Sequence, residues 1–182
     1  MTPRAMRDEM IVFAVMAVLL APNAFVVEHV HNDLIAAHVE TELPSGVDIT
    51  RVSSARELQD ATLAEAREAD VVIMAAAVAD YRPDTVGEHK MKKSEDGTDP
   101  VIRLVRNPDI LRAVVAQRAE RSLEQLIVGF AAETENLLEY ASRKLRDKNL
   151  DLIVANDVAN PSIGFNSEEN AITVIDRGLQ QI

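Results

Sequence analysis

Residues 53–80, SSARELQDATLAEAREADVVIMAAAVAD, decide the fold class because a helical pattern is followed at once by a buried strand. A serine at either of the first two positions can act as the N-cap of the helix. The helix carries an apolar stripe near the helical period, made of Leu58, Ala61, Ala64 and Ala66. The run VVIMAAAVA at 71–79 is apolar throughout, as expected for a strand covered on both faces. This succession indicates an α/β protein.

The same alternation continues along the chain. Helical patterns occupy 107–120 and 134–150, and the first of them places Asn107 as N-cap with Pro108 at the first helical position. Strands and helices that alternate in this way predict one mostly parallel sheet covered on both sides. LIAAHV at 34–39 is a short apolar stretch, and ELPSGVD at 42–48 reads as a loop. Further strands are predicted at VIRLV (101–105), QLIVGFAA (125–132), DLIVAND (151–157) and NAITVID (170–176).

Composition limits the class of protein. A chain of 182 residues, 47% of them hydrophobic, suits a single domain with a real core. Its net charge of -11 argues against general nucleic-acid binding, which needs an excess of lysine and arginine. The absence of cysteine excludes disulfides, thiolate metal sites and cysteine nucleophiles, and it is typical of a cytoplasmic protein.

The amino end contains a short apolar run, IVFAVMAVLLAPNAFVV at 11–27, after a weakly basic start. That order faintly resembles a signal peptide, but Asp8 and Glu9 abut the run while Pro22 and Asn23 interrupt it. The uninterrupted part is far shorter than the roughly 20 residues of a membrane span. We therefore expect a buried helix, then a turn and a strand, and no membrane segment.

Ligands of mostly parallel sheets bind at the carboxyl ends of the strands, which selects three predicted strand tips. They are AVADYRP at 77–83, FAAET at 130–134 and ANDVANPSIGFNS at 155–167. At the first tip, Asp80 can accept a hydrogen bond from a ribose or a base, or it can simply cap a turn. The sequence alone favours neither interpretation.

Basic residues provide further candidate anion contacts. The run KMKK at 90–93 is either a solvated charge patch or a loop that closes over a triphosphate, with Lys90, Lys92 and Lys93 neutralising phosphate oxygens. Lys144 and Lys148 lie four residues apart on one helix face, where they complement the helix dipole or contact phosphate.

The start of the helix at NPDIL is a weaker cue for an anion. Its exposed backbone N–H groups can hold a phosphate, although every helix has such an end. Asp109 would compete with a phosphate for this position.

Other constellations lack the parts that they need. His29 and His31 share one side of a strand, but no third metal ligand lies close in sequence. The chain has neither G-x-G-x-x-G nor G-x-x-x-x-G-K-[ST], and it shows no serine, histidine and acid set. A nucleotide site in this chain must therefore use another design.

Six motifs together carry a family resemblance. In chain order they are AAAVADYRP, KMKK, RNPDIL, VGFAAET, YASRKLRDKNLDLIVANDV and IGFNSEENAITVI, and the match runs from Leu34 to Ile175. This series resembles phosphopantothenoylcysteine synthetase, the phosphopantothenate–cysteine ligase half of a bacterial bifunctional coenzyme A biosynthesis protein. The resemblance implies a Rossmann-like three-layer fold with a mostly parallel central sheet. It also implies a cytoplasmic homodimer that joins 4'-phosphopantothenate to L-cysteine with CTP and Mg²⁺.

The resemblance further implies roles for individual residues. Lys90 resembles the family's catalytic lysine on a loop that orders over the nucleotide, and the metal ligands are left unassigned. The expected chemistry has two steps, in which the substrate carboxylate attacks the α-phosphate of CTP and cysteine then displaces CMP from the acyl cytidylate. The expected nucleotide-binding residues are Met74, Ala75, Ala76, Asp80, Lys90, Pro108, Asp109, Ile110, Leu111, Phe130, Lys144 and Lys148.

The chain departs from the family pattern at its amino end. The glycine-rich GGT tip and the NRSSGK-type segment do not occur in residues 1–33, so we treat 1–33 as an atypical segment and 34–182 as the CTP-binding ligase domain. The decarboxylase half is missing as well, so no flavin is expected here, and association with a separate decarboxylase domain is an open possibility. Two alternatives follow: a fragment that binds CTP and dimerises without turnover, or an unrelated dinucleotide-binding oxidoreductase.

Overall fold

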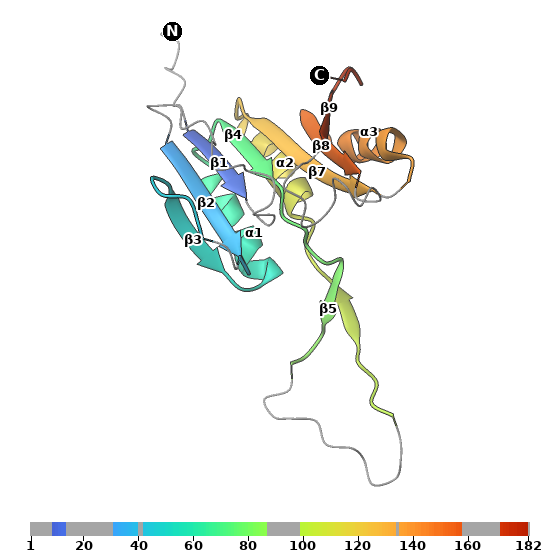
Figure 1. Ribbon diagram of the computed structural model, residues 1–182. Helices are drawn as coiled ribbons and strands as arrows, with labels where there is room; N and C mark the ends of the chain where they lie inside the picture. The colour runs from blue at the N-terminus through green and yellow to red at the C-terminus, as the bar shows by residue number, and fades with distance from the viewer. Residues whose placement is uncertain are drawn as a thin grey trace.

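A seven-stranded sheet forms the centre of the protein (Figure 1). The computed structural model describes residues 9–13, 31–39, 42–86, 99–133, 135–157 and 172–181. The strand order is β3-β2-β1-β4-β7-β8-β9. The strands of this sheet are β1 (Glu9–Phe13), β2 (His31–Ala37), β3 (Asp48–Val52), β4 (Val71–Met74), β7 (Leu126–Glu133), β8 (Leu152–Asp157) and β9 (Ile172–Asp176).

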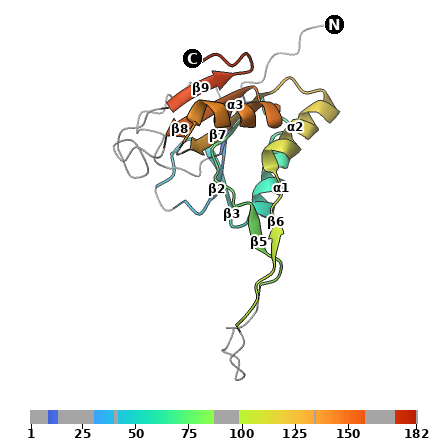
Figure 2. The ribbon, with the colours of Figure 1, turned by 90° about the vertical axis from the view of Figure 1, so that its right-hand side faces the viewer.

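All neighbouring strands of the sheet run parallel except β9, which pairs antiparallel with β8 at one edge. Within the described residues, three helices lie between parallel strands: α1 (Ala55–Glu65), α2 (Ile110–Arg121) and α3 (Leu137–Asp147). Each connection steps in the same direction along the sheet, and right-handed crossovers place such helices on one face. Figure 2 shows α1 and α2 together beside the sheet. The predicted Rossmann-like α/β fold is confirmed.

The core lies between this face and the helices. Val72 of β4, Ile127 of β7 and Ile153 of β8 are all fully buried. Because side chains alternate along a strand, each of these residues points to the helical face while its neighbours point away. Leu58, Val114 and Leu145 reach the same cluster from α1, α2 and α3. In the part of the chain that the structure describes, no helix is long and apolar enough to cross a bilayer.

Two predicted elements at the amino half differ from the structure. Residues 11–13, expected to begin a helix, belong to strand β1, which pairs with both β2 and β4. The rest of that expected helix lies outside the described residues. The strand expected at 71–79 ends at Met74, where the pairing with Phe13 and Gly129 ends as well. Residues 75–79 are thereby released from the ladder as a loop.

Two further predictions, around residues 101–110, need correction. The strand expected at 101–105 is β6 (Leu104–Arg106), which pairs with β5 (Tyr81–Pro83) in a separate antiparallel ribbon. The helix expected to begin with Asn107 as cap begins later, because the N-cap of α2 is Asp109. The carboxylate of Asp109 accepts from the backbone N–H of Arg112 at 3.2 Å. Strand β3 was not expected at all.

The ribbon of β5 and β6 projects from the carboxyl end of the sheet, away from the body of the molecule (Figures 1 and 2). We call its described part, residues 81–86 and 99–106, the arm. Its large exposed apolar side chains are Tyr81, Val86, Val101, Ile102 and Leu104.

Candidate functional site

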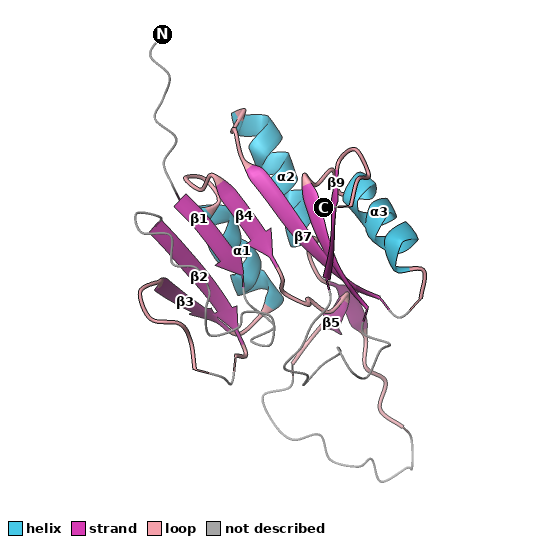
Figure 3. Cartoon of the chain, turned by 45° about the horizontal axis from the view of Figure 1, so that its top comes forward, coloured by secondary structure: helices cyan, strands magenta, loops and turns pink. Residues whose placement is uncertain are grey.

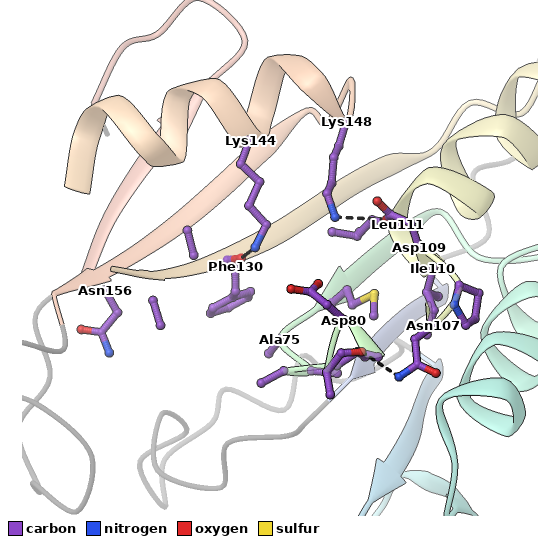
Figure 4. A pocket seen from close by; sticks show the side chains of 18 residues that line it. Ala75, Asp80, Asn107, Asp109, Ile110, Leu111, Phe130, Lys144, Lys148 and Asn156 are labelled. Carbon is purple, nitrogen blue, oxygen red and sulfur yellow. Dashed lines mark hydrogen bonds and ion pairs between the residues drawn. The ribbon is translucent and has the colours of Figure 1, made fainter. Parts of the chain in front are cut away.

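A pocket of about 450 Å³ opens where β4, β7 and β8 reach their carboxyl ends. Its volume lies within the range of small-molecule sites, roughly 300–1,000 Å³. The loop after β4, the start of α2, the end of β7 and the second half of α3 each contribute one wall (Figure 4). The rule that ligands bind at the carboxyl ends of parallel strands thus agrees with the pocket's position.

Eleven of the twelve residues implied by the family resemblance line this one pocket. The twelfth, Lys90, lies outside the described residues, as do Lys92 and Lys93. The residues brought together are Met74, Ala75, Ala76, Asp80, Pro108, Asp109, Ile110, Leu111, Phe130, Lys144 and Lys148.

The loop that carries Asp80 is held by Asn107, which explains why Asn107 is not the helix cap. Its side-chain amide donates to the carbonyl of Ala79 at 2.7 Å, and its backbone N–H donates to the carbonyl of Asp80 at 2.8 Å. Arg82 in turn donates to the side-chain oxygen of Asn107 at 3.2 Å. These bonds fix the backbone around Asp80 and leave its carboxylate exposed at the pocket.

Asp109 occupies the start of α2, where the sequence analysis expected it to compete with a phosphate. One of its carboxylate oxygens lies 3.1 Å from Nζ of Lys148, and the other lies 3.4 Å from Nε of Arg112. An anion that binds at this helix end must therefore compete with Asp109 for Lys148. The pair is partly exposed, so exchange of partners costs little.

Lys144 is the more buried of the two pocket lysines. Its ammonium donates to the carbonyl of Phe130 at 2.5 Å. Burial, followed by the charge of Lys148, lowers the pKa of Lys144, while Glu133, Asp109 and Asp80 act in the opposite direction. A phosphate in the pocket would supply the counter-charge that the buried ammonium lacks.

Asn156, at the tip of β8, is a pocket residue that our residue-by-residue reasoning did not select. It is 5% exposed, and its side-chain oxygen has no hydrogen-bond partner within the described ranges. A buried amide oxygen without a partner costs about 1–3 kcal/mol, which a ligand donor can recover. The signal was available, because the strand-tip rule pointed to ANDVANPSIGFNS, whose second residue is Asn156.

A shallower pocket of about 390 Å³ adjoins the first and shares Lys144 and Lys148 with it. It adds Arg112, Arg143, Tyr140 and two acidic residues. The guanidinium of Arg143 lies 4.9 Å from the centre of the Tyr140 ring, a cation–π contact. The cationic side of the main pocket therefore continues onto the surface of α3.

The arrangement suits a phosphorylated ligand with a flat or apolar part. Phe130 and the alanines of the loop after β4 offer apolar contacts, whereas Lys144 and Lys148 offer ammonium groups for phosphate oxygens. The carboxylates of Asp80 and Asp109 are oxygen ligands of the kind that Mg²⁺ takes alongside substrate phosphates.

Comparison with known proteins identifies relatives of the chain. The family model described as DNA/pantothenate metabolism flavoprotein C-terminal domain matches residues 16–182. The Coenzyme A biosynthesis bifunctional protein CoaBC of Vibrio vulnificus strain YJ016 is 46% identical over 141 residues, which is 78% of this chain and 34% of that protein. The same-named protein of Escherichia coli K12 is 44% identical over 140 residues, again 34% of its length. The chain thus spans about a third of these relatives.

Solved structures agree with the fold. The crystal structure of the C-terminal domain of Coenzyme A biosynthesis bifunctional protein CoaBC aligns with a TM-score of 0.64 at 34% identity, covering 85% of this chain and 64% of that one. A mutant of Cab2, H337A, in complex with phosphopantothenate-cysteine aligns with a TM-score of 0.68 over 97% of this chain and 80% of that one. At 14% identity, the second likeness bears on the fold alone.

Proposed function

Because the chain belongs to the family of the DNA/pantothenate metabolism flavoprotein C-terminal domain, we propose that it ligates 4'-phosphopantothenate to L-cysteine for coenzyme A biosynthesis. CTP would be the activating nucleotide, with release of pyrophosphate and CMP. The supporting relatives carry the name Coenzyme A biosynthesis bifunctional protein. As a biosynthetic ligase, the chain would work in the cytoplasm.

One observation carries the proposal. Eleven residues spread from Met74 to Lys148 in the sequence, all implied by the ligase resemblance, converge on a single pocket. The pocket joins apolar walls to two ammonium groups, and this combination fits a nucleoside triphosphate.

The residues of the pocket would act mainly by stabilising the negative charge of the phosphates. Attack by the substrate carboxylate on the α-phosphate of CTP forms the acyl–phosphate bond and breaks the bond to pyrophosphate. Negative charge grows at the phosphate oxygens during this step, and Lys144 and Lys148 would stabilise it. Bound Mg²⁺ would neutralise part of the triphosphate charge. Asp80 is the exposed pocket carboxylate best suited to hold that ion with the phosphates.

The second step uses the amine of cysteine. It attacks the acyl carbon of the cytidylate, the new amide bond forms, and CMP leaves with the electron pair of the broken bond. Lys90, which lies outside the described residues, is proposed as the catalytic lysine from the family resemblance. Phe130 and the buried amide of Asn156 would contact the nucleotide, because both line the apolar end of the pocket.

A homodimer belongs to the same proposal. Its support is the arm, whose five large apolar side chains are at least half exposed in the single chain. Exposed apolar groups gathered on a projecting element are typical of a surface that is covered in an assembly. Association with a decarboxylase domain is also proposed, since the relatives are bifunctional by name.

A fragment that binds CTP without turnover is the second candidate function. Its supporting observation is the absence of the GGT and NRSSGK-type motifs from residues 1–33. The dinucleotide-binding oxidoreductase alternative gains no support from the family match.

The deciding experiment measures pyrophosphate release by the purified chain with CTP, Mg²⁺ and 4'-phosphopantothenate, with and without cysteine. Release followed by CMP and the cysteine conjugate is expected. Lys90→Gln should still bind CTP yet lose most turnover. CTP binding without release by the unaltered chain would identify the fragment, and no binding would overturn the proposal.

Calorimetric titration of CTP with Asn156→Leu tests the pocket itself. Affinity should fall about tenfold, the equivalent of one lost hydrogen bond, while the melting temperature holds or rises because an unpartnered buried oxygen is removed. Gln125→Leu is the matched control, since Gln125 donates to the carbonyls of Ala66 and Ala69 away from the pocket. That control should melt earlier and bind CTP normally. Equal CTP affinity in Asn156→Leu and the unaltered chain would exclude Asn156 from the site.

A further inference from the structure

Three metal-ligating side chains meet at the amino ends of β2 and β3, whereas the candidate functional site lies at the carboxyl ends of β4, β7 and β8. They are His31, Asp33 and Asp48, and one ligand atom from each lies within 4.8 Å of the others. Nε2 of His31 is 3.5 Å from a carboxylate oxygen of Asp33 and 3.5 Å from one of Asp48. We propose that these three side chains bind a divalent transition-metal ion of the Zn²⁺ class.

The backbone holds the three donors together. Asp33 and Asp48 are direct partners in the parallel ladder of β2 and β3, so their side chains leave the sheet side by side. His31 precedes Asp33 by two residues on the same strand and therefore shares its face. The sequence analysis had paired His31 with His29, which lies outside the described residues. In the structure the neighbours of His31 are instead Asp33, on the same strand, and Asp48, which the ladder brings from β3.

The spacing fits an ion better than it fits direct hydrogen bonds. A separation of 3.5 Å exceeds the usual 2.7–3.2 Å of an N–H···O bond. Ligand atoms at the corners of a tetrahedron with bonds of about 2.1 Å lie roughly 3.4 Å apart, as in zinc sites. The two distances from His31 therefore match the separation of ligands around a small cation, and the third pair of ligand atoms lies within 4.8 Å.

The charges of the two carboxylates also favour a bound cation. Two carboxylates directly opposite each other on neighbouring strands repel, and a bound cation would remove that cost. One imidazole with two carboxylates suits Zn²⁺, Co²⁺ or Ni²⁺, whereas Mg²⁺ prefers oxygen ligands alone. The side chain of His31 is 56% exposed and that of Asp48 is 77% exposed, so water can complete the coordination.

A metal ion at this position would tie the edge strand β3 to β2. Strand β3 is exposed along most of its length and follows the loop at 42–47, so it has little apolar packing of its own. The ion would join the first residues of both strands and thereby stabilise the edge of the sheet. Because the site lies across the sheet from the nucleotide pocket, it does not depend on the proposed ligase activity.

The test titrates the untagged full chain with Zn²⁺ by calorimetry and with Co²⁺ by visible absorption. One ion per chain should bind. His31→Gln and Asp48→Asn should each weaken binding by at least about tenfold, since even outer-shell changes cost that much. His38→Gln is the matched control, because His38 lies on an exposed loop beside the carbonyl of Ser53. It should leave affinity unchanged.

Melting curves complete the design. Without metal, His31→Gln should melt like the unaltered chain, because the replaced side chain is exposed. Asp48→Asn should melt at the same or a slightly higher temperature, because it removes the repulsion between the two carboxylates. Zn²⁺ should raise the melting temperature of the unaltered chain and of His38→Gln only. Absence of Zn²⁺ binding by the unaltered chain would overturn the proposal, as would undiminished binding by His31→Gln.

Discussion

At the scale of single residues, Lys144 is the most informative side chain. Burial, and then the charge of Lys148, lowers its pKa from the ordinary 10.5. Between the lowered value and 10.5, the unfolded chain keeps a proton that the folded chain has lost. The unfolded state therefore binds more protons in this window, and the Lys144 contribution to stability rises with pH across it.

A phosphate ligand would raise the pKa of Lys144 again, and this gives a prediction about the pH dependence of binding. An anion beside Lys144 restores its proton, so CTP affinity should fall as pH rises through the lowered pKa toward 10.5. Lys144→Arg should keep its affinity over the same range, because arginine stays charged. Titration calorimetry in two buffers with different ionisation heats measures the affinity and the proton uptake. Identical pH profiles for both proteins would remove Lys144 from the anion site.

At the scale of the elements, the close approach of β7 to the helices depends on Gly129. A Cβ at this position would lie 2.6 Å from one methyl of Leu150 and 3.4 Å from one of Leu111. Leu150, in the turn after α3, is 1% exposed, so its side chain or β7 would have to shift within a close-packed core to admit the Cβ. The glycine therefore sets the distance of β7 from α2 and from the turn after α3, directly beside the pocket residue Phe130.

Gly129→Ala should lower the free energy of unfolding by about 1–3 kcal/mol, the usual cost of overpacking a core. Urea denaturation at constant m-value measures the loss. Gly178→Ala is the control, since its Cβ would meet only a carboxylate oxygen of Asp176 at 3.3 Å on the surface. Its effect should stay within about 0.5 kcal/mol. Equal stabilities of the two variants would show that β7 shifts to accept the methyl group.

The strands also show which elements of the fold the sequence patterns could predict. The buried strands β4, β7 and β8 were predictable, because apolar runs between helical patterns have few other interpretations. Strand β3 was missed because four of its five residues, including Asp48 and Arg51, are exposed and leave no apolar signal. Strand β1 was read as a helix because an apolar run in the middle of a sheet lacks alternation.

Sequence reasoning brought some of the pocket residues to notice and missed others, each for a physical reason. The tip rule and the family motifs located the pocket walls, since both depend on chain order. The role of Asn107 could not be read from its sequence context, because its partner Ala79 lies 28 residues away. Asn156 likewise stands out only when burial reveals its unpartnered oxygen.

At the scale of the whole molecule, the arm is the surface through which we propose that copies of the chain associate. It projects from the sheet (Figure 3). Its Val101 is 95% exposed and its Ile102 is 61% exposed. A pair of arms packed together would cover these side chains at about 25 cal/mol for each Å² buried.

Replacement of Ile102 and Leu104 by aspartate should convert a dimer into a monomer, as measured by light scattering after size exclusion. Both side chains are more than half exposed in the single chain, so the monomer should keep its melting temperature. Leu138→Asp, at an exposed apolar position on α3, is the control and should remain dimeric. A monomeric unaltered chain, or a double variant that still dimerises, would contradict the proposal.

The two tyrosines lie where their intrinsic fluorescence can serve as a probe of assembly and of ligand binding. The chain has no tryptophan and two tyrosines, so its near-ultraviolet emission comes from Tyr81 and Tyr140 alone. Tyr81 lies on the arm, half exposed, and Tyr140 lies under Arg143 beside the cationic pocket. Under the proposed function, quenching of Tyr81 would report assembly, and quenching of Tyr140 would report nucleotide binding. Replacement of either tyrosine by phenylalanine would leave one emitter, whose fluorescence would then report a single event without any added dye.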